Sequence, residues 1–265
     1  MLNDSYRTFP QFLQKRSEEA FNVPQSGQYH LPSGIGSTDE SIEFIKDYSS
    51  NLDFPVIIIR NAENLGFAKA VNQGILKSSY PYIFSLNNDT QVEESGIKPL
   101  IDLISSDEGI FSVASKMVQF DNKNLIDDAG DEYNILAWTK KTGENQPAEN
   151  YDEVYEIFSS CAGAAMYNKA ILDKIGLFDE NFFAYMEDVD LSYRAKINGY
   201  KNLFCPDSVV YHIGSATSGS RYNKFKVKLA ARNNVWTVYK NFPIPQKILN
   251  FIFLFLGFLI KYLFF

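Results

Sequence analysis

The sequence predicts an α/β domain with a mainly parallel sheet flanked by helices, followed by a helical C-terminal tail. From residue 34 onward, apolar extended stretches alternate with stretches whose apolar residues recur at helical spacing. This alternation is the pattern of βαβ units, in which helices connect parallel strands. The composition agrees, because 45% of the 265 residues are apolar and 22% are charged, as in an ordinary globular protein.

Each expected element has its own signal in the sequence. Residues 56–59 are a continuous β-branched run, which is typical of a strand that is buried on both faces. Residues 66–77 give the clearest helix, because apolar side chains recur at i, i+3, i+4, i+7 and i+8 from Phe67. The remaining helices are expected at residues 39–48, 97–104, 169–175 and 188–198, and the remaining strands at residues 82–86, 112–118 and 208–212.

Two segments do not fit this alternation. Residues 1–33 contain no β-branched run and no clean strand, and their prolines and glutamines indicate loosely ordered chain. Residues 121–150 are polar and irregular, which predicts a long loop or a small hairpin.

The charge is distributed unevenly along the chain. Residues 221–265 hold eight basic residues and no acidic one, whereas all 32 acidic residues precede them. Residues 248–265 are apolar apart from Asn250 and Lys261. As a helix, these 18 residues would reach about 27 Å, slightly less than a typical hydrocarbon core. A buried core helix is the alternative, but a helix that is apolar on every side needs protein all round it. We therefore expect shallow insertion into an anionic membrane surface.

The N-terminus, the number of cysteines and the missing motifs limit where the protein can be located and what it can bind. The N-terminus has no apolar core of the kind found in signal peptides, and two cysteines are too few for a disulfide framework. We expect a peripheral or tail-anchored protein on the cytoplasmic face of the cell membrane, with no nucleic-acid partner. No Walker-type loop or GxGxxG motif occurs, which disfavours the P-loop and nicotinamide classes.

The first candidate site is Asn87-Asn88-Asp89, directly after the strand expected at residues 82–86. Ligands of open α/β sheets gather outside the carboxyl ends of the strands. A carboxylate there can hold a hard divalent cation, which in turn holds phosphate oxygens. A plain turn is the alternative, because Asn and Asp are favoured turn residues.

The second candidate lies in residues 178–191, which hold five carboxylates and four aromatic residues. Acidic decoration of a helix N-terminus explains Glu187, Asp188 and Asp190 as first-turn residues. It does not explain the large aromatic residues beside them, unless these form the wall of a cleft. A carboxylate held at a helix N-terminus can accept a proton from a bound hydroxyl, and the two interpretations are compatible.

The third candidate is His212, which closes the last expected strand and precedes a segment rich in Ser, Thr and Gly. A structural role is the alternative for a single histidine at a strand end. His212 has no convincing Ser or Cys partner in the sequence, so a nucleophilic triad is not expected.

Taken together, these motifs resemble the family 2 glycosyltransferases, which are inverting enzymes of the GT-A fold, and most closely their rhamnosyltransferase-type branch. The resemblance covers roughly residues 34–240. The motifs that carry it are residues 61–75, residues 84–90, the series of short motifs between residues 163 and 212, the remnant at residues 36–41, and Arg232-Asn233.

The resemblance implies a role for each matching residue. Asp89 would hold Mg²⁺ or Mn²⁺ against the donor diphosphate, and His212 would be a further ligand of that metal. Asp188, with Glu187 beside it, would be the base that deprotonates the acceptor hydroxyl. The resemblance also implies donor-binding residues, which are Asn64, Gly66, Asn72, Asn87, Asn88 and Asp89, and residues on the acceptor side, which are Asp190 and Tyr185.

The implied function is transfer of a sugar, with inversion, from a nucleotide donor to a glycan or lipid-linked acceptor in cell-surface polysaccharide synthesis. The N-terminus departs from the family, because no opening strand is recognisable and Gly34 and Ile35 replace an acidic residue and Asn. A catalytically inactive or truncated GT-A-fold protein that only binds partners is therefore the alternative. A glycoside hydrolase is disfavoured, because Asp89 and His212 would have no task in it. Four divisions of the chain are expected. They are an atypical N-terminal segment (1–33), the GT-A glycosyltransferase domain (34–220), a basic helical segment (221–247) and a hydrophobic membrane-associating tail (248–265).

Overall fold

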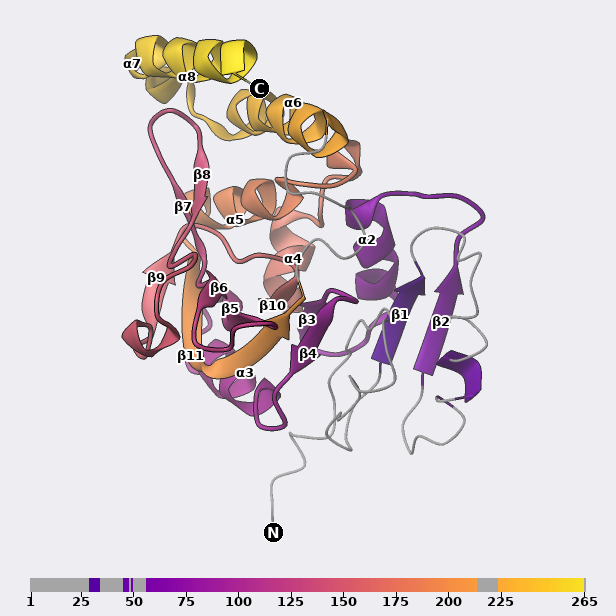
Figure 1. Cartoon of the computed structure of the whole chain (residues 1–265). Coiled ribbons are helices and arrows are strands. Elements are labelled where there is room, and N and C mark those ends of the chain that lie inside the picture. Colours follow the sequence, from indigo (N-terminus) through magenta and orange to yellow (C-terminus); the bar gives the residue numbers. More distant parts are fainter. Residues whose placement is uncertain (1–28, 34–44, 48, 50–55, 214–223, 265) are drawn as a thin grey trace.

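The computed structural model describes residues 29–33, 45–47, 49, 56–213 and 224–264 (Figure 1). The helix predicted at residues 39–48 lies mostly outside this part, although residues 45–47 are helical. The motif remnant at residues 36–41 and most of the segment that follows His212 lie outside the described residues as well.

A seven-stranded sheet forms the centre of the molecule (Figure 1). Five of its strands form a continuous path, and two short strands pair with members of that path. In order along the path the strands are β3 (Tyr82–Leu86), β10 (Ala164–Asn168), β5 (Ile110–Gln119), β11 (Lys201–His212) and β4 (Thr90–Val92), with β6 (Ile126–Asp128) on β5 and β9 (Tyr155–Ile157) on β11.

The predicted α/β class with helices around a sheet is confirmed, but the sheet is mixed rather than mainly parallel. Strands β5 and β11 are parallel, whereas β10 is antiparallel to both of its neighbours, β3 and β5. Strand β10 has no clear signal in the sequence, because two of its five residues are alanine and its β-propensity is weak. An antiparallel strand between β3 and β5 makes parallel βαβ pairing impossible at that position.

A second, two-stranded sheet corrects the expectation for the N-terminal segment. Strand β1 (Tyr29–Ser33) pairs in parallel with β2 (Val56–Arg60), with Tyr29 opposite Val56. The prediction that residues 1–33 contain no strand is therefore wrong for the last five of them. Strand β1 lacks a β-branched run of its own, so pairing with β2 rather than local composition defines it.

Residues 121–150 contain a hairpin, which was one of the two predicted outcomes. Strands β7 (Asp131–Tyr133) and β8 (Thr139–Lys141) pair antiparallel, and a short 3₁₀ helix, η2 (Ala148–Asn150), follows them. Gly130 begins the hairpin with a φ of 95°, and a Cβ there would lie 2.6 Å from Cγ2 of Ile157. Glycine is therefore required both for the backbone conformation and for the close approach of β9.

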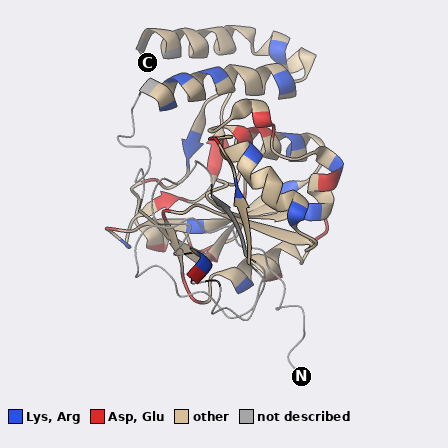
Figure 2. Cartoon of the chain, turned by 90° about the vertical axis from the view of Figure 1, so that its right-hand side faces the viewer, with Lys and Arg blue, Asp and Glu red and all other residues tan. Residues whose placement is uncertain are grey.

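Three helices form the C-terminal part of the chain: α6 (Lys224–Asn241), α7 (Ile244–Leu249) and α8 (Phe251–Phe264). Lysine and arginine residues lie on α6, whereas α8 is almost free of charge (Figure 2). The predicted apolar tail is thus two helices, and none of the helices in the described residues is both long and apolar enough to span a membrane. Helix α8 packs through Leu254 and Phe258 beside Ala137, at the tip of the β7–β8 hairpin.

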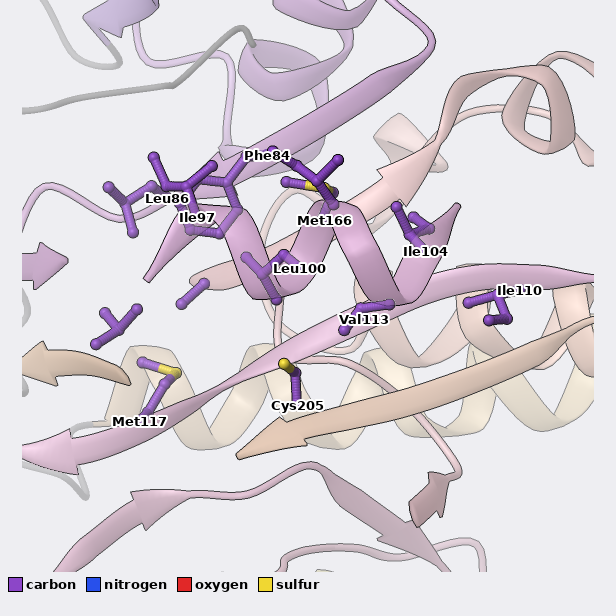
Figure 3. Close-up of a cluster of buried hydrophobic side chains, with 13 residues drawn as sticks. Phe84, Leu86, Ile97, Leu100, Ile104, Ile110, Val113, Met117, Met166 and Cys205 are labelled. Atoms are coloured by element: carbon purple, nitrogen blue, oxygen red, sulfur yellow. The ribbon is translucent and has the colours of Figure 1, made fainter. Parts of the chain in front are cut away.

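Helices cover both faces of the central sheet. Helix α3 (Ile97–Ile104) packs on one face, where its apolar stripe meets Phe84 and Met166 (Figure 3). Neighbouring strand residues such as Ile83 face the opposite side. That side is covered by α2 (Phe67–Lys77), α4 (Lys169–Ile175) and α5 (Glu187–Ile197). These four helices confirm the corresponding predictions to within one residue at each end.

Candidate active site

Asp89 and His212 lie side by side at the edge of the sheet. Strand β4 begins directly after Asp89 and pairs antiparallel with the end of β11, with Thr90 opposite His212. Oδ1 of Asp89 is buried, accepts no hydrogen bond from the described residues, and lies 3.5 Å from Nε2 of His212. The sequence placed both residues at strand ends, and the structure brings them together.

Asp127 holds the other nitrogen of the imidazole. It lies on β6, next to β5, and β5 pairs in parallel with β11. Oδ2 of Asp127 is 2.8 Å from Nδ1 of His212 and accepts a 3.0 Å hydrogen bond from Nζ of Lys141. Burial raises the pKa of Asp127, but the His212 hydrogen bond and the Lys141 charge outweigh it and lower the pKa to about 2. Burial lowers the pKa of His212, whereas the hydrogen bonds and charges of Asp127 and Asp89 raise it. The raising effects are larger, and the resulting pKa is about 9.

Asp188 lies at the start of helix α5, as predicted. Its Oδ1 accepts a hydrogen bond from the backbone N–H of Val189 at 2.8 Å, and its Oδ2 accepts one from Ala162 at 3.2 Å. Two backbone donors from different elements therefore fix the orientation of this carboxylate. Burial raises the pKa of Asp188, and the backbone hydrogen bonds and the positive charge of Lys141 oppose the rise. A rigid carboxylate with a raised pKa has the properties of a general base.

Glu187 lies beside Asp188 but is more deeply placed. Its side chain is buried, and Oε2 has no hydrogen-bond partner among the described residues. Burial and the neighbouring charge of Asp188 raise the pKa of Glu187 well above its ordinary value.

Two further acidic residues, Asp128 and Asp131, belong to the same cluster and were not predicted as site residues. Oδ2 of Asp128 lies 3.6 Å from Nζ of Lys141 and has no hydrogen-bond partner in the described part of the chain. Burial raises its pKa to about 6. Burial and the charges of Asp128 and Asp188 also raise the pKa of Asp131 well above its ordinary value. The available signal was three carboxylates within five residues around Gly130, in the segment that was predicted to be a long loop or a small hairpin.

Lys141 connects the two halves of this site. Its ammonium group contacts Asp127, which orients His212. It also contacts Asp128, whose charge interacts with that of Asp188. Its charge also acts on Asp188. One half-buried cation therefore offsets several carboxylates that would otherwise repel each other.

A loop of unusual backbone conformation precedes Asp188. Phe183, Tyr185 and Met186 have φ values of 66°, 68° and 71°, in the left-handed region that non-glycine residues rarely adopt. Asn233 on α6 donates hydrogen bonds to three carbonyls of this loop, those of residues 182, 184 and 185. The motif residue Arg232 donates to the carbonyls of residues 181 and 182. Helix α6 thus holds the loop that leads to the base.

The structure places the predicted donor-side residues around the start of α2. Asn64 accepts a hydrogen bond from the N–H of Gly66 at 3.0 Å, and a Cβ on Gly66 would lie 2.5 Å from the carbonyl oxygen of Phe183. Gly66 therefore permits close contact with the loop before the base. Asn72 is buried and exchanges hydrogen bonds of 2.8 and 3.1 Å with the backbone of Phe178, which ties α2 to that loop. A donor-binding role for these residues stays a prediction.

The remaining predicted residues separate into two groups. Asn87 and Asn88 are half-buried in the turn between β3 and Asp89, where the N–H of Asn87 donates to the carbonyl of Gly163 at 2.8 Å. Tyr185 is 36% exposed in the strained loop. Asp190, by contrast, is fully buried, and its carboxylate is already bound by other side chains of the protein. Its partners are Arg194 at 3.0 Å, Lys240 at 3.0 Å and Asn241 at 2.8 Å.

The residues present fit a divalent cation that also contacts the donor. No group of three His, Cys, Asp or Glu side chains suitable for a metal occurs within the described residues. Asp89 nevertheless offers a buried oxygen without a hydrogen-bond partner, and Asp127 directs Nε2 of His212 toward it. Mg²⁺ typically takes one or two carboxylates from the protein and its other ligands from phosphates and water. A second-sphere carboxylate on the histidine is the usual support for such a ligand.

Comparison with known proteins gives a family match and several relatives. Residues 36–176, just over half of the chain, match the family described as Glycosyl transferase family 2. The poly-beta-1,6-N-acetyl-D-glucosamine synthase of Staphylococcus aureus (strain COL) is 24% identical over 190 residues, which cover 71% of this chain and 43% of the relative. The synthase of Staphylococcus epidermidis is 22% identical, with the same coverage. The chain thus spans less than half of the length of these curated relatives.

Solved structures share the fold at low sequence identity. GalNAc-T7, crystallised with UDP, GalNAc and Mn²⁺, has a TM-score of 0.69 at 17% identity and covers 89% of this chain and 48% of its own. The mannosyltransferase PcManGT from Pyrobaculum calidifontis, in complex with GDP-Man and Mn²⁺, has a TM-score of 0.60 at 12% identity, with coverages of 96% and 73%. TarS of S. aureus with UDP-GlcNAc has a TM-score of 0.57 at 14% identity, with coverages of 96% and 72%. These likenesses confirm the predicted GT-A fold.

Proposed function

The chain belongs to glycosyl transferase family 2, and on that premise we propose that it transfers a hexosyl or rhamnosyl group from a nucleoside diphosphate donor to a glycan or lipid-linked acceptor, with inversion. The names of the curated relatives, which are synthases of a polysaccharide, support a place in polysaccharide synthesis, and we propose that the product belongs to the cell surface. The donor chemistry has support from neighbours that bind UDP-GlcNAc and GDP-Man.

The observation that carries the proposal is that one half-buried lysine links a rigid carboxylate to the Asp89–His212 pair. Asp188 is fixed by two backbone donors and feels the charge of Lys141, and Lys141 contacts Asp127, which holds His212 beside Asp89. This arrangement separates a base from the position of a charged leaving group, as in-line displacement requires. Strand β1 pairs with β2, so the lack of an opening strand no longer favours an inactive protein.

In the proposed reaction, Asp188 takes the proton of the acceptor hydroxyl as that oxygen attacks the anomeric carbon. The bond from the anomeric carbon to the diphosphate oxygen breaks on the opposite face, and the configuration inverts. Asp89 and His212 would hold Mg²⁺ or Mn²⁺, and when bound the metal offsets the negative charge on the leaving diphosphate. Asp127 keeps the imidazole of His212 in position, and the strained loop before Met186 keeps Asp188 in place.

Turnover of defined donors tests this proposal. Purified protein with Mn²⁺ is incubated with UDP-GlcNAc, GDP-Man and dTDP-rhamnose, and release of the nucleoside diphosphate is measured with and without a glycan acceptor. Release from one donor, with the opposite anomeric configuration in the product by NMR, is the expected result. Donor binding by calorimetry without any release would instead establish the catalytically inactive alternative. No binding of any donor would overturn the proposal.

We also propose that helices α6 to α8 attach the protein peripherally to the cytoplasmic face of the membrane. Apolar side chains of α8 such as Ile252 and Phe255 are 67% and 57% exposed, a large apolar surface that monomeric soluble proteins rarely present. The neighbouring α6 carries several basic residues and no acidic one, which favours an anionic lipid surface (Figure 2). Arg232 and Lys240 bind within the protein, so only part of this charge is available to lipid.

Vesicle binding tests the location. The full chain should sediment with vesicles that contain anionic phosphatidylglycerol, and the double variant Ile252→Glu, Phe255→Glu should stay in the supernatant. Leu76→Glu is the matched control, because Leu76 is 73% exposed on α2, away from the tail. It should sediment as the unchanged protein does. Equal sedimentation of all three proteins, or of none, would contradict the membrane proposal.

A further inference from the structure

A hollow of about 450 Å³ lies between the β7–β8 hairpin and β9, outside the residues assigned above to donor and metal. We call it the hairpin hollow. Four aromatic residues line it, together with carboxylates and an amide. The aromatic residues are Tyr133, Trp138, Tyr155 and Phe158.

The aromatic walls are held rigidly by their own contacts. The rings of Tyr133 and Phe158 stack with centroids 4.8 Å apart, and edge contacts from Tyr193 support both of them. The ring of Tyr155 stacks on Phe204 at 4.8 Å, and its hydroxyl donates to the carbonyl of Ala129 at 2.8 Å. A ligand therefore meets preformed apolar surfaces and does not have to order them.

The polar groups of the hollow select a neutral ligand that is rich in hydroxyls. The carboxylates of Asp131, Glu132 and Glu156 line the hollow beside one lysine, Lys140. Lys196 outside the lining pairs with Glu156, so the lining has no excess of positive charge that would attract a phosphate or another anion. Carboxylates accept hydrogen bonds from hydroxyl groups strongly. The hydroxyl of Tyr133 is buried and has no hydrogen-bond partner among the described residues. Aromatic faces beside carboxylates match the two kinds of surface on a pyranose ring, its C–H faces and its hydroxyl edge.

The hairpin hollow is close to the proposed base. Asp131 lines the hollow, and its charge acts on Asp188. Ile157 forms part of the wall, and five residues later the N–H of Ala162 donates to Oδ2 of Asp188. Five extended residues span at most about 17 Å, a distance that an oligosaccharide of a few units covers.

We propose that the hairpin hollow binds a neutral sugar unit of the acceptor, at a distance from the hydroxyl that is deprotonated. This inference rests on the proposed function, because it assigns the hollow to the acceptor of that reaction. It replaces Asp190, whose carboxylate is occupied by Arg194, Lys240 and Asn241, as the acceptor-side contact.

The two tryptophans of the chain allow a direct test by fluorescence. Trp138 lines the hollow, and Trp236 is the other one, so Trp236→Phe leaves Trp138 as the single reporter. The reporter protein is titrated with neutral trisaccharides (triacetylchitotriose, cellotriose, maltotriose and mannotriose) and with inorganic phosphate. A saturable change in emission with at least one trisaccharide, and none with phosphate, is the expected result. No response to any trisaccharide, or a response to phosphate alone, would overturn the proposal.

Matched carboxylate variants locate the binding. Glu132→Gln in the reporter background should weaken the trisaccharide about tenfold, because a charge-assisted hydrogen bond becomes a neutral one. Glu153→Gln, an exposed acidic residue outside the hollow, should leave the affinity unchanged. In the transfer assay, Glu132→Gln should raise the acceptor KM and leave acceptor-independent donor hydrolysis unaltered. Equal affinities for the two variants would refute the site, whereas the absence of nucleoside diphosphate release from every donor by the unchanged protein, with or without acceptor, would refute only the proposed function.

Discussion

Replacing Asn233 with alanine tests whether α6 holds the loop before the proposed base. The side-chain amide of Asn233 is fully buried and donates to the carbonyls of residues 182, 184 and 185 at 2.9, 2.9 and 2.7 Å. Three non-glycine residues in the same loop are in the left-handed region, and this backbone conformation costs about 1–2 kcal/mol for each of them. Such a conformation persists only where the surroundings impose it.

The expected loss of stability follows from these contacts. The NH₂ group has two hydrogens, so it makes the equivalent of two full hydrogen bonds to the three carbonyls. Each buried acceptor left without a donor costs about 1–3 kcal/mol, so two of them cost about 2–6 kcal/mol. Water that enters the vacated space and partial relaxation of the left-handed residues return some of this. We expect a decrease in the free energy of unfolding of about 3 kcal/mol, or a Tm lower by roughly 6–12 °C.

Asn234 provides a control on the neighbouring residue. It is 1% exposed, yet neither its Nδ2 nor its Oδ1 has a hydrogen-bond partner in the described part of the chain. Asn234→Ala removes an amide that pays the cost of burial without a bond, so its effect should stay within about 1 kcal/mol. Urea unfolding, followed by circular dichroism, measures both variants. Equal losses of unfolding free energy in the two variants, or an unchanged midpoint for Asn233→Ala, would show that Asn233 does not hold the loop.

Three further predictions concern acidic residues of the candidate site, namely Asp188, Asp127 and Asp128. Asp188→Asn keeps shape but removes basicity, so kcat should fall about 10²–10⁴-fold while donor affinity by calorimetry changes little; near-normal turnover would move the base to another residue. Asp127→Asn should weaken Mn²⁺ binding about 10–100-fold, because His212 loses its orienting carboxylate, and an unchanged Kd would exclude that role. Burial raises the pKa of Asp128 from 3.8 to about 6, so the folded state binds more protons between these values and the free energy of unfolding should fall as pH rises through about 4 to 6. Asp128→Asn should flatten that part of the profile, measured by denaturation between pH 4 and pH 7, and an unaltered slope would contradict the assignment.

Local periodicity was enough to predict most of the helices and the layered class. The apolar stripe from Phe67 and the end of α5 at Gly199 are signals that short stretches of chain contain in full. Strand direction is different, because it depends on which strands become neighbours. Nothing in the composition of β10 shows that it lies between β3 and β5, and β1 becomes a strand through its pairing with β2.

The site shows the same division. Asp89, His212 and Asp188 were recognisable because each lies at the end of a strand or the start of a helix. Asp127 and Lys141 were not, because their role comes from contacts with residues far away in sequence, 85 positions in the case of His212. Asp190 is the converse case. The family resemblance implied a role toward the acceptor, whereas its carboxylate pairs with Arg194 on the same helix and with Lys240 on α6.

The position of Asn233 near the C-terminal end of the described chain has a consequence for protein synthesis. A chain is made from its N-terminus, and domains begin to fold as they emerge from the ribosome. The sheet and the carboxylates of the acidic cluster are complete by residue 212, before any part of α6 exists. Until α6 has left the ribosome, the loop lacks the hydrogen bonds that Asn233 donates to it, and the left-handed residues lack the contacts that hold them. The geometry around Asp188 is therefore completed last, and a chain that is released before residue 233 has the strands of the sheet but not the helix that completes the site.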